Sequence, residues 1–221
     1  RRGMSYNVDF LIAGLAILLL ILWHFLGQKR AEDLNNQVFL FFAIVGSLDL
    51  VTELISSYYI ISEKGYFGIA SVLVTTIFYL FQAVIPFALI CYVQTLYENK
   101  IISAKRMLLS GLPTFVLIGI VLTNPFTEKL FYFDVSEGYM RGPWYMLMYY
   151  SALAHVLVAI FLILFWRKEL GYRKVKILLE ILFIAGVGIV IQFLDNSLLT
   201  TGFGLSLGIL ALFITINNPY A

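Results

Sequence analysis

The sequence predicts an all-α membrane protein, a bundle of seven transmembrane helices, and the composition is the first reason. Of the 221 residues, 61% are hydrophobic and only 13% are charged, whereas soluble domains average about 45–50% apolar and about 25% charged residues. The mean hydropathy is +0.92. The apolar residues would fill about six or seven spans of roughly 20 residues each. We therefore expect one membrane domain over 1–221, with almost nothing outside the bilayer.

The second reason is the alternation of apolar stretches with short polar breaks along the chain. In hydrocarbon every backbone N–H and C=O group must be bonded within the protein, and no alternating ten-residue pattern suggests a barrel, so the spans are helices. The last two spans are separated only by short polar sequences around Asp195 and Thr200, which indicates a tight hairpin. The spans are expected at about 7–26, 38–61, 69–96, 107–123, 144–166, 177–197 and 199–216.

Individual spans carry further signals. The first apolar run, from Phe10 to Leu26, is too long for a cleavable signal peptide and lacks a small-residue cleavage site. The third contains Pro86, which frees a carbonyl group and can kink the helix. The sixth and seventh carry small residues whose spacing favours close helix packing, and these are Gly186 and Gly188 on one span and Gly204, Gly208 and Ala211 on the other.

The third reason is the distribution of basic residues, which also predicts the orientation. The loops after the first, third and fifth spans carry ten Lys and Arg residues, and the opposite side carries five. The positive-inside rule therefore places the N-terminus outside and the C-terminus in the cytoplasm. The ten are Lys29, Arg30, Lys100, Lys105, Arg106, Arg167, Lys168, Arg173, Lys174 and Lys176, and the five are Arg1, Arg2, Lys64, Lys129 and Arg141.

Several functional classes are disfavoured by what the sequence contains. The net charge is only +2 and the basic residues are scattered, which argues against a nucleic-acid partner. The single cysteine, Cys91, cannot form an internal disulfide. The sequence has no HExxH or glycine-rich phosphate-loop motif. We therefore expect no catalytic residues, no metal site and no cofactor, and we do not expect the chain itself to be an enzyme.

The longest external segment, 124–144, is too aromatic for a slack linker. Its Trp and Tyr side chains are typical of residues that lie at the level of the lipid headgroups. Two interpretations are open: the segment folds back on the membrane surface, or it forms a lid over a pocket between the helices.

Polar residues deep in the spans are the candidate functional residues, because an ionisable side chain at the centre of a span costs about 2.5–3.5 kcal/mol. Asp49 and Glu53 are four residues apart, which puts both carboxylates on one face of the second span. Others lie at similar depth on the third, fifth and sixth spans. The candidate ligand-binding residues are Asp49, Glu53, Gln82, His155, Gln192 and Asp195.

Two interpretations of this polar group also remain open. It lines an outward-facing cavity that admits a ligand or ion, or it is an interhelical hydrogen-bond network that serves packing alone. No Lys or Arg occurs at mid-depth in the spans, so His155 is the protein's only candidate cation for the two acids. Otherwise one carboxyl group is protonated, or water reaches both.

The segment that begins at Asn124 and the end of the chain carry a family resemblance. The residues concerned are Asn124-Pro125-Phe126, Leu130-Phe131-Tyr132, Tyr139-Met140-Arg141-Gly142-Pro143-Trp144, Tyr149 and Ile214-Thr215-Ile216-Asn217-Asn218-Pro219-Tyr220. This pattern resembles the seven-helix sensor regions at the N-terminus of bacterial histidine kinases and GGDEF-type diguanylate cyclases. The resemblance covers nearly the whole chain. It implies that a cytoplasmic output domain begins near the exit from the last span, and we expect that domain to be missing after residue 221.

The resulting expectation is a signal-receptor domain in a bacterial plasma membrane, active as a homodimer. A small extracellular or membrane-borne ligand would bias a two-state helix arrangement, and the seventh span would relay that bias to a kinase or GGDEF output domain. One alternative is a small proton-coupled transporter with Asp49, Glu53 and His155 as the relay. Another is a structural subunit in which the polar residues only pack.

Overall fold

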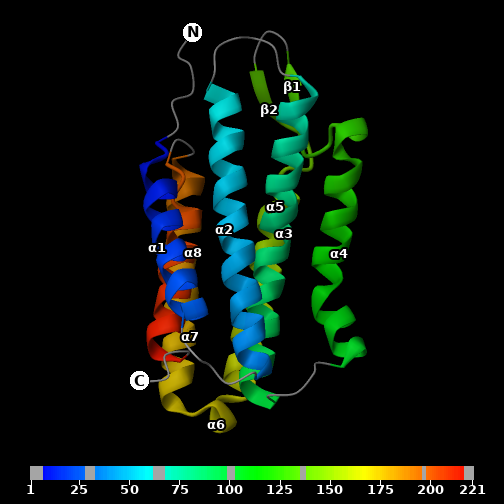
Figure 1. The fold of residues 1–221 in the computed structure, drawn as a ribbon. Helices are drawn as coiled ribbons and strands as arrows, with labels where there is room; N and C mark the ends of the chain where they lie inside the picture. The colour runs from blue at the N-terminus through cyan, green and yellow to red at the C-terminus, as the bar shows by residue number, and fades with distance from the viewer. Residues whose placement is uncertain are drawn as a thin grey trace.

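Long helices that run side by side form the body of the molecule (Figure 1). The computed structural model describes residues 7–27, 33–61, 68–98, 103–134, 138–195 and 198–216. Among them, six helices are long and apolar enough to cross a membrane, which confirms an all-α membrane bundle. They are α1 (Asp9–Gly27), α2 (Leu34–Ile61), α3 (Ile69–Glu98), α4 (Ala104–Thr127), α5 (Met146–Phe165) and α7 (Tyr172–Leu194).

The last apolar helix, α8 (Thr201–Thr215), is shorter than the others at 15 residues. At 1.5 Å per residue it is roughly 22 Å long, less than the ~30 Å hydrocarbon core of a typical bilayer. The expected seventh span at 199–216 therefore corresponds to a helix that is apolar but short. A four-residue helix, α6 (Arg167–Leu170), connects α5 to α7 and was not expected from the sequence.

Three helices, α2, α4 and α7, begin three to five residues before their predicted spans because polar residues continue the helix outside the apolar stretch. Helix α4 begins at Ala104 rather than 107. Its N-cap residue is Ser103, whose Oγ accepts a hydrogen bond of 3.4 Å from the backbone N–H of Arg106. Helix α7 begins at Tyr172 and includes the basic residues before 177, and it ends at Leu194 rather than 197. Some residues that bear on the predicted orientation and family resemblance lie outside the described part: Arg1, Arg2, Lys29, Arg30, Lys64, Lys100 and the exit segment 217–221. Residues 196 and 197, in the predicted tight hairpin, also lie outside it.

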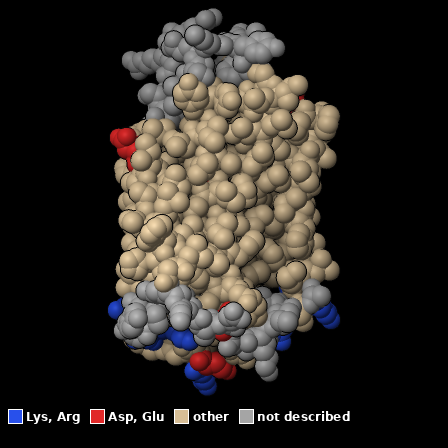
Figure 2. All heavy atoms as spheres, in the orientation of Figure 1, with Lys and Arg blue, Asp and Glu red and all other residues tan. Residues whose placement is uncertain are grey.

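Charged side chains gather toward the ends of the bundle. Figure 2 shows Lys and Arg at the end that carries α6, and no charged residue across the middle of this face. Many of the large apolar side chains on the outer faces are exposed, for example Trp23, Leu109 and Phe183. A soluble protein rarely exposes so much contiguous apolar surface, so the exposed faces are suited to lipid.

Helix α8 lies beside α1 and α7 and also contacts α2, while α3 contacts α2, α4 and α5 (Figure 1). Small residues bring α7 and α8 close together, as their spacing predicted, except at Gly186, where an added Cβ atom would meet nothing within 4 Å. A Cβ atom placed on Gly188 would lie 3.1 Å from the carbonyl oxygen of Thr200, and one on Gly204 would lie 3.4 Å from that of Ile184. The main apolar core spans α1, α2, α3, α5, α7 and α8, with Leu18, Phe39, Tyr92 and Ile163 buried in it.

The aromatic external segment forms an antiparallel hairpin of β1 (Phe131–Asp134) and β2 (Gly138–Arg141), with Phe131 opposite Arg141. The side chain of Asn124, at the end of α4, holds the start of this hairpin. Its Oδ1 accepts from the backbone N–H of Leu130 at 2.7 Å, and its Nδ2 donates to the carbonyl oxygen of Phe131 at 3.0 Å. Hairpin residues pack in a second apolar cluster with α3 and α4, so the segment is a folded structure at one end of the bundle.

Candidate functional site

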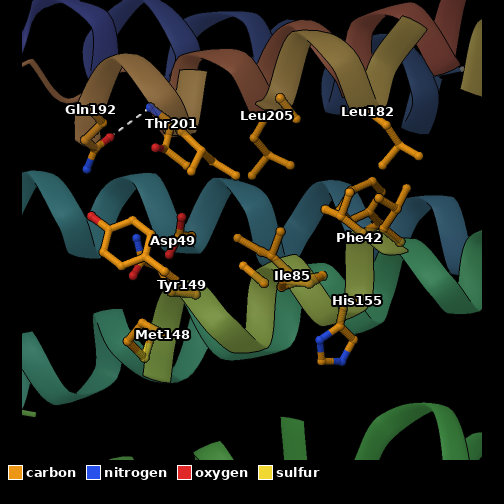
Figure 3. Close-up of a pocket in the computed structure, with 18 of the residues that line it drawn as sticks. Phe42, Asp49, Ile85, Met148, Tyr149, His155, Leu182, Gln192, Thr201 and Leu205 are labelled. Atoms are coloured by element: carbon orange, nitrogen blue, oxygen red, sulfur yellow. Dashed lines mark hydrogen bonds between the residues drawn. The ribbon is translucent and has the colours of Figure 1, made fainter. Parts of the chain in front are cut away.

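A cavity of about 150 Å³ lies inside the bundle between α2, α3, α5, α7 and α8 (Figure 3). Most of its wall is apolar, with Phe42, Ile85, Leu89, Leu182 and Leu205 among the lining residues. The polar side chains Asp49, Tyr149, Gln192 and Thr201 gather at one end, and Leu182 and Phe42 lie at the other. The cavity is therefore amphipathic along its length.

The two acids of α2 are buried together, as their spacing predicted. Asp49 is 3% exposed and Glu53 is 4% exposed. Asp49 lines the large cavity, and no donor in the described part of the chain reaches its Oδ1 atom. Leaving a buried polar atom without a partner costs about 1–3 kcal/mol, and more for a charged group. The described protein groups alone therefore leave this carboxyl oxygen unsatisfied.

Gln192, near the end of α7, links α7 to the start of α8. Its Oε1 accepts a hydrogen bond of 2.9 Å from the backbone N–H of Thr201, the first residue of α8 (Figure 3). The hydroxyl of Thr200 donates to the carbonyl oxygen of Gly188 at 2.9 Å. The polar residues that predicted a tight hairpin thus tie the start of α8 to α7, directly at the cavity wall.

Gln82 and Pro86 contribute the α3 side of the cavity. Proline has no N–H, so the carbonyl group of Gln82, four residues earlier, lacks its usual helical partner. Both residues line the cavity, which places a polar side chain and a weakened turn of helix at the same wall.

A second, smaller cavity of about 60 Å³ lies next to the first and is more polar. The two share Gln82, Tyr145 and Gln192 as lining residues. The smaller one is also lined by Glu53, Ser56 and Thr75, and the hydroxyls of Ser56 and Thr75 are 2.9 Å apart. It lies toward the hairpin, since Tyr139 and Arg141 of β2 form part of its wall. This arrangement corresponds to the lid interpretation of the external segment.

Arg141 is the functional candidate that the sequence argument missed. It was counted only as an external charge, yet its guanidinium lies over the ring of Tyr145, 4.3 Å from the centroid, and it lines the same small cavity as Glu53. Partial burial lowers the pKa of Arg141, whereas the phenols of Tyr145 and Tyr139 raise it. The net pKa lies above the ordinary value for arginine, so the guanidinium is charged. The only available signal was its place within the aromatic external segment.

His155 lines the cavity but its ring turns toward α4, away from Asp49 (Figure 3). Its Nε2 lies 2.9 Å from the hydroxyl oxygen of Thr114, and its Nδ1 lies 2.7 Å from the carbonyl oxygen of Ser151. Both ring nitrogens are thus engaged outside the acid pair, so His155 is not the partner of these carboxylates.

Asp195 is the one predicted site residue that stands apart. It is the exposed C-cap of α7 and lines neither cavity. The structure therefore brings together Asp49, Gln82, Gln192 and, at the wall, His155, with Glu53 in the adjoining cavity. Within the described ranges, no group of three or more His, Cys, Asp or Glu side chains could hold a metal ion.

Comparisons of the sequence with protein-family models, with curated proteins and with solved structures found no match.

Proposed function

We propose that this protein is a membrane receptor domain that binds a small molecule in the cavity beside Asp49 and transmits its occupancy through α8. The observation that supports this most strongly is the buried Asp49 Oδ1, for which the described residues provide no hydrogen-bond partner. A ligand group that bonds to this atom would supply the missing interaction. The surrounding apolar wall would hold the rest of the molecule.

Helix α8 is the element through which occupancy would be transmitted. Three of its residues, Thr201, Gly202 and Leu205, line the cavity, and the helix contacts α1, α2 and α7. A ligand shifts an equilibrium between two helix arrangements only by its difference in affinity for them. To shift the populations of the two arrangements from 1:99 to 99:1, the ligand must bind the favoured arrangement about 10⁴ times more tightly than the other. The receiving partner in this proposal is a cytoplasmic kinase or GGDEF output domain, and the receptor acts as a homodimer in a bacterial plasma membrane.

A cavity-filling substitution tests the transmission step. Ala152→Phe would place a ring in the cavity, and Leu153→Phe would add one on the neighbouring, exposed face of α5. Spin labels at Ile214 on α8 and Leu108 on α4, both exposed, would report their separation in a Cys91→Ala background. We expect Ala152→Phe to change the distance distribution and Leu153→Phe to leave it unchanged. Identical distributions in a folded Ala152→Phe protein would contradict the proposal.

The transporter alternative makes a different prediction. Its relay would need His155 near the two carboxylates, and the His155 ring is engaged with Thr114 and Ser151 instead. Proton flux into sealed vesicles that contain the purified protein, abolished by Asp49→Asn, would favour the transporter over the receptor.

A further inference from the structure

The large cavity has an acidic group but no basic one. Among its lining residues, all within the described part of the chain, Asp49 is the carboxyl group and none is Lys or Arg. His155 is on the wall, but its ring nitrogens are bonded to Thr114 and Ser151. The charged Arg141 belongs to the adjoining small cavity, on the hairpin side. A carboxyl group with no basic side chain beside it in a mostly apolar cavity is suited to a cation or a hydrogen-bond donor and disfavours an anion.

Resting on the proposed receptor function, we propose that the cavity binds a small amphiphilic primary amine, with its ammonium group against Asp49 and its apolar body toward Leu205 and Leu182. An ammonium group donates hydrogen bonds and offers positive charge, which is what the Oδ1 atom lacks. An ion pair formed out of water needs close contact and further polar partners to offset desolvation. Tyr149 and Gln192, at the same end of the cavity, supply these partners.

The shape of the cavity sets the size and direction of the ligand. A volume of about 150 Å³ holds a molecule roughly as large as benzene. The polar end lies at Asp49 and the apolar end at Leu182 and Phe42 (Figure 3). The ring of Tyr149 beside Asp49 can also face the ammonium group, an arrangement that attracts cations. A six-membered ring that carries one aminomethyl group has the required size and polarity.

Three fluorinated probes of nearly equal size separate charge from shape: 3-fluorobenzylamine, 3-fluorobenzyl alcohol and 3-fluorobenzoate. Binding would be measured by the broadening of the ¹⁹F signal with the full chain in nanodiscs of neutral phosphatidylcholine. Empty nanodiscs correct for partition into lipid. We expect saturable binding of the amine, with a Kd at least about tenfold lower than that of the alcohol, and no binding of the benzoate. Equal affinities for amine and alcohol, or binding of the benzoate, would overturn the proposal.

Two variants locate the amine. Asp49→Asn keeps the shape of the side chain and removes its charge, and it should weaken amine binding by about tenfold or more. Asp195→Asn, at an exposed carboxyl group outside the cavity wall, should leave the Kd unchanged. Ala152→Phe blocks the space without touching the carboxyl group and should abolish binding. Unchanged amine affinity in Asp49→Asn would show that the amine does not bind at this carboxyl group.

The outcomes for the ligand class and for the receptor function are distinguishable. If Ala152→Phe changes the position of α8 while no amine binds, the receptor function stands and the ligand class is wrong. If amine binds at Asp49 but neither the amine nor Ala152→Phe alters the label distances, the ligand site stands and transmission through α8 is wrong.

Discussion

The Nε2 atom of His155 on α5 lies 2.9 Å from the hydroxyl oxygen of Thr114 on α4, and both residues are buried. The Nδ1 atom lies 2.7 Å from the carbonyl oxygen of Ser151, which can only accept, so Nδ1 carries a proton. In the neutral ring, Nε2 then accepts from the Thr114 hydroxyl. The same hydroxyl can instead donate its one proton to the carbonyl oxygen of Ala83 on α3, which lies 3.2 Å away. Thr114 thus joins three helices.

Thr114→Val should lower the free energy of unfolding by about 0.6 kcal/mol, the average measured for interhelical hydrogen bonds in a membrane protein, and by no more than about 1.7 kcal/mol, the largest value measured. The substitution keeps the shape of the side chain and leaves His155 Nε2 without its partner on α4. The measurement is thermal unfolding in nanodiscs, followed by tryptophan fluorescence. Thr123→Val is the control, because Thr123 is exposed on α4 and its hydroxyl donates to Gly119 in its own helix. Equal losses in the two variants would show that the interhelical contact adds nothing.

Gly202→Ala should destabilise the contact between α8 and α2. A Cβ atom at Gly202 would lie 2.2 Å from Leu50 Cδ2 and 3.3 Å from Leu11 Cδ2, so the buried Leu50 side chain must shift or the helices must separate. Overpacking of this kind costs about 1–3 kcal/mol. Gly186→Ala is the matched control, because a Cβ atom there meets nothing within 4 Å. It should be neutral or stabilising by about 0.5–1 kcal/mol, since glycine is unfavourable inside a helix. Similar melting temperatures for both variants would contradict this packing argument.

Hydropathy located the helices well because the cost of burying polar residues in lipid acts on each stretch independently of its neighbours. The same one-dimensional signal gives the depth of a residue but not the direction in which it points around the helix axis. His155 and Asp49 were expected at similar depth, yet the packing of α5 against α4 turns the His155 ring toward Thr114. By contrast, Asp49 and Glu53 lie on one helix, so their spacing alone was sufficient to place them on one buried face.

The β1–β2 hairpin could not be predicted from the sequence, for a different reason. Its strands have four residues each, too few for an alternating pattern to stand out from the aromatic content of the segment. Its position depends on the Asn124 side chain, which bonds to backbone groups six and seven residues later. From the sequence, Arg141 contributes only to the predicted orientation in the membrane, because its contact with the Tyr145 ring exists only once the hairpin folds.

Asn124→Ala should loosen the hairpin. The backbone N–H of Leu130 would lose its buried acceptor, which costs about 1–3 kcal/mol. Trypsin should then cleave after Lys129 and Arg141 about tenfold faster in nanodiscs, because the open population rises by that factor for each 1.4 kcal/mol. Asn124→Asp keeps the acceptor and loses the donor, so its rate should be intermediate. Cleavage at Lys168, at the other end of the bundle, is the internal reference. Unchanged rates in Asn124→Ala would mean that other contacts hold the hairpin.

The orientation can be tested with two single cysteines in a Cys91→Ala background. Glu128 follows α4 at the hairpin end, and Lys168 lies in α6 at the opposite end, and both are exposed (Figure 1). The excess of Lys and Arg on the α6 side predicts that this side faces the cytoplasm. A membrane-impermeant maleimide should therefore label Glu128→Cys in intact cells, and Lys168→Cys only after permeabilisation.

The reverse labelling pattern would show that the protein has the opposite orientation, with the smaller, Arg141-lined cavity on the cytoplasmic side. A ligand from outside would then have to cross the bilayer to reach Asp49 through that cavity. The orientation therefore decides whether the amine is an external signal or an internal one. In the predicted orientation, the proposed amine would approach from the hairpin side, past Tyr139 and Arg141, before reaching the carboxyl group. Tyr139→Phe, which removes the hydroxyl bonded to Tyr79, should then speed amine exchange without changing its affinity at Asp49.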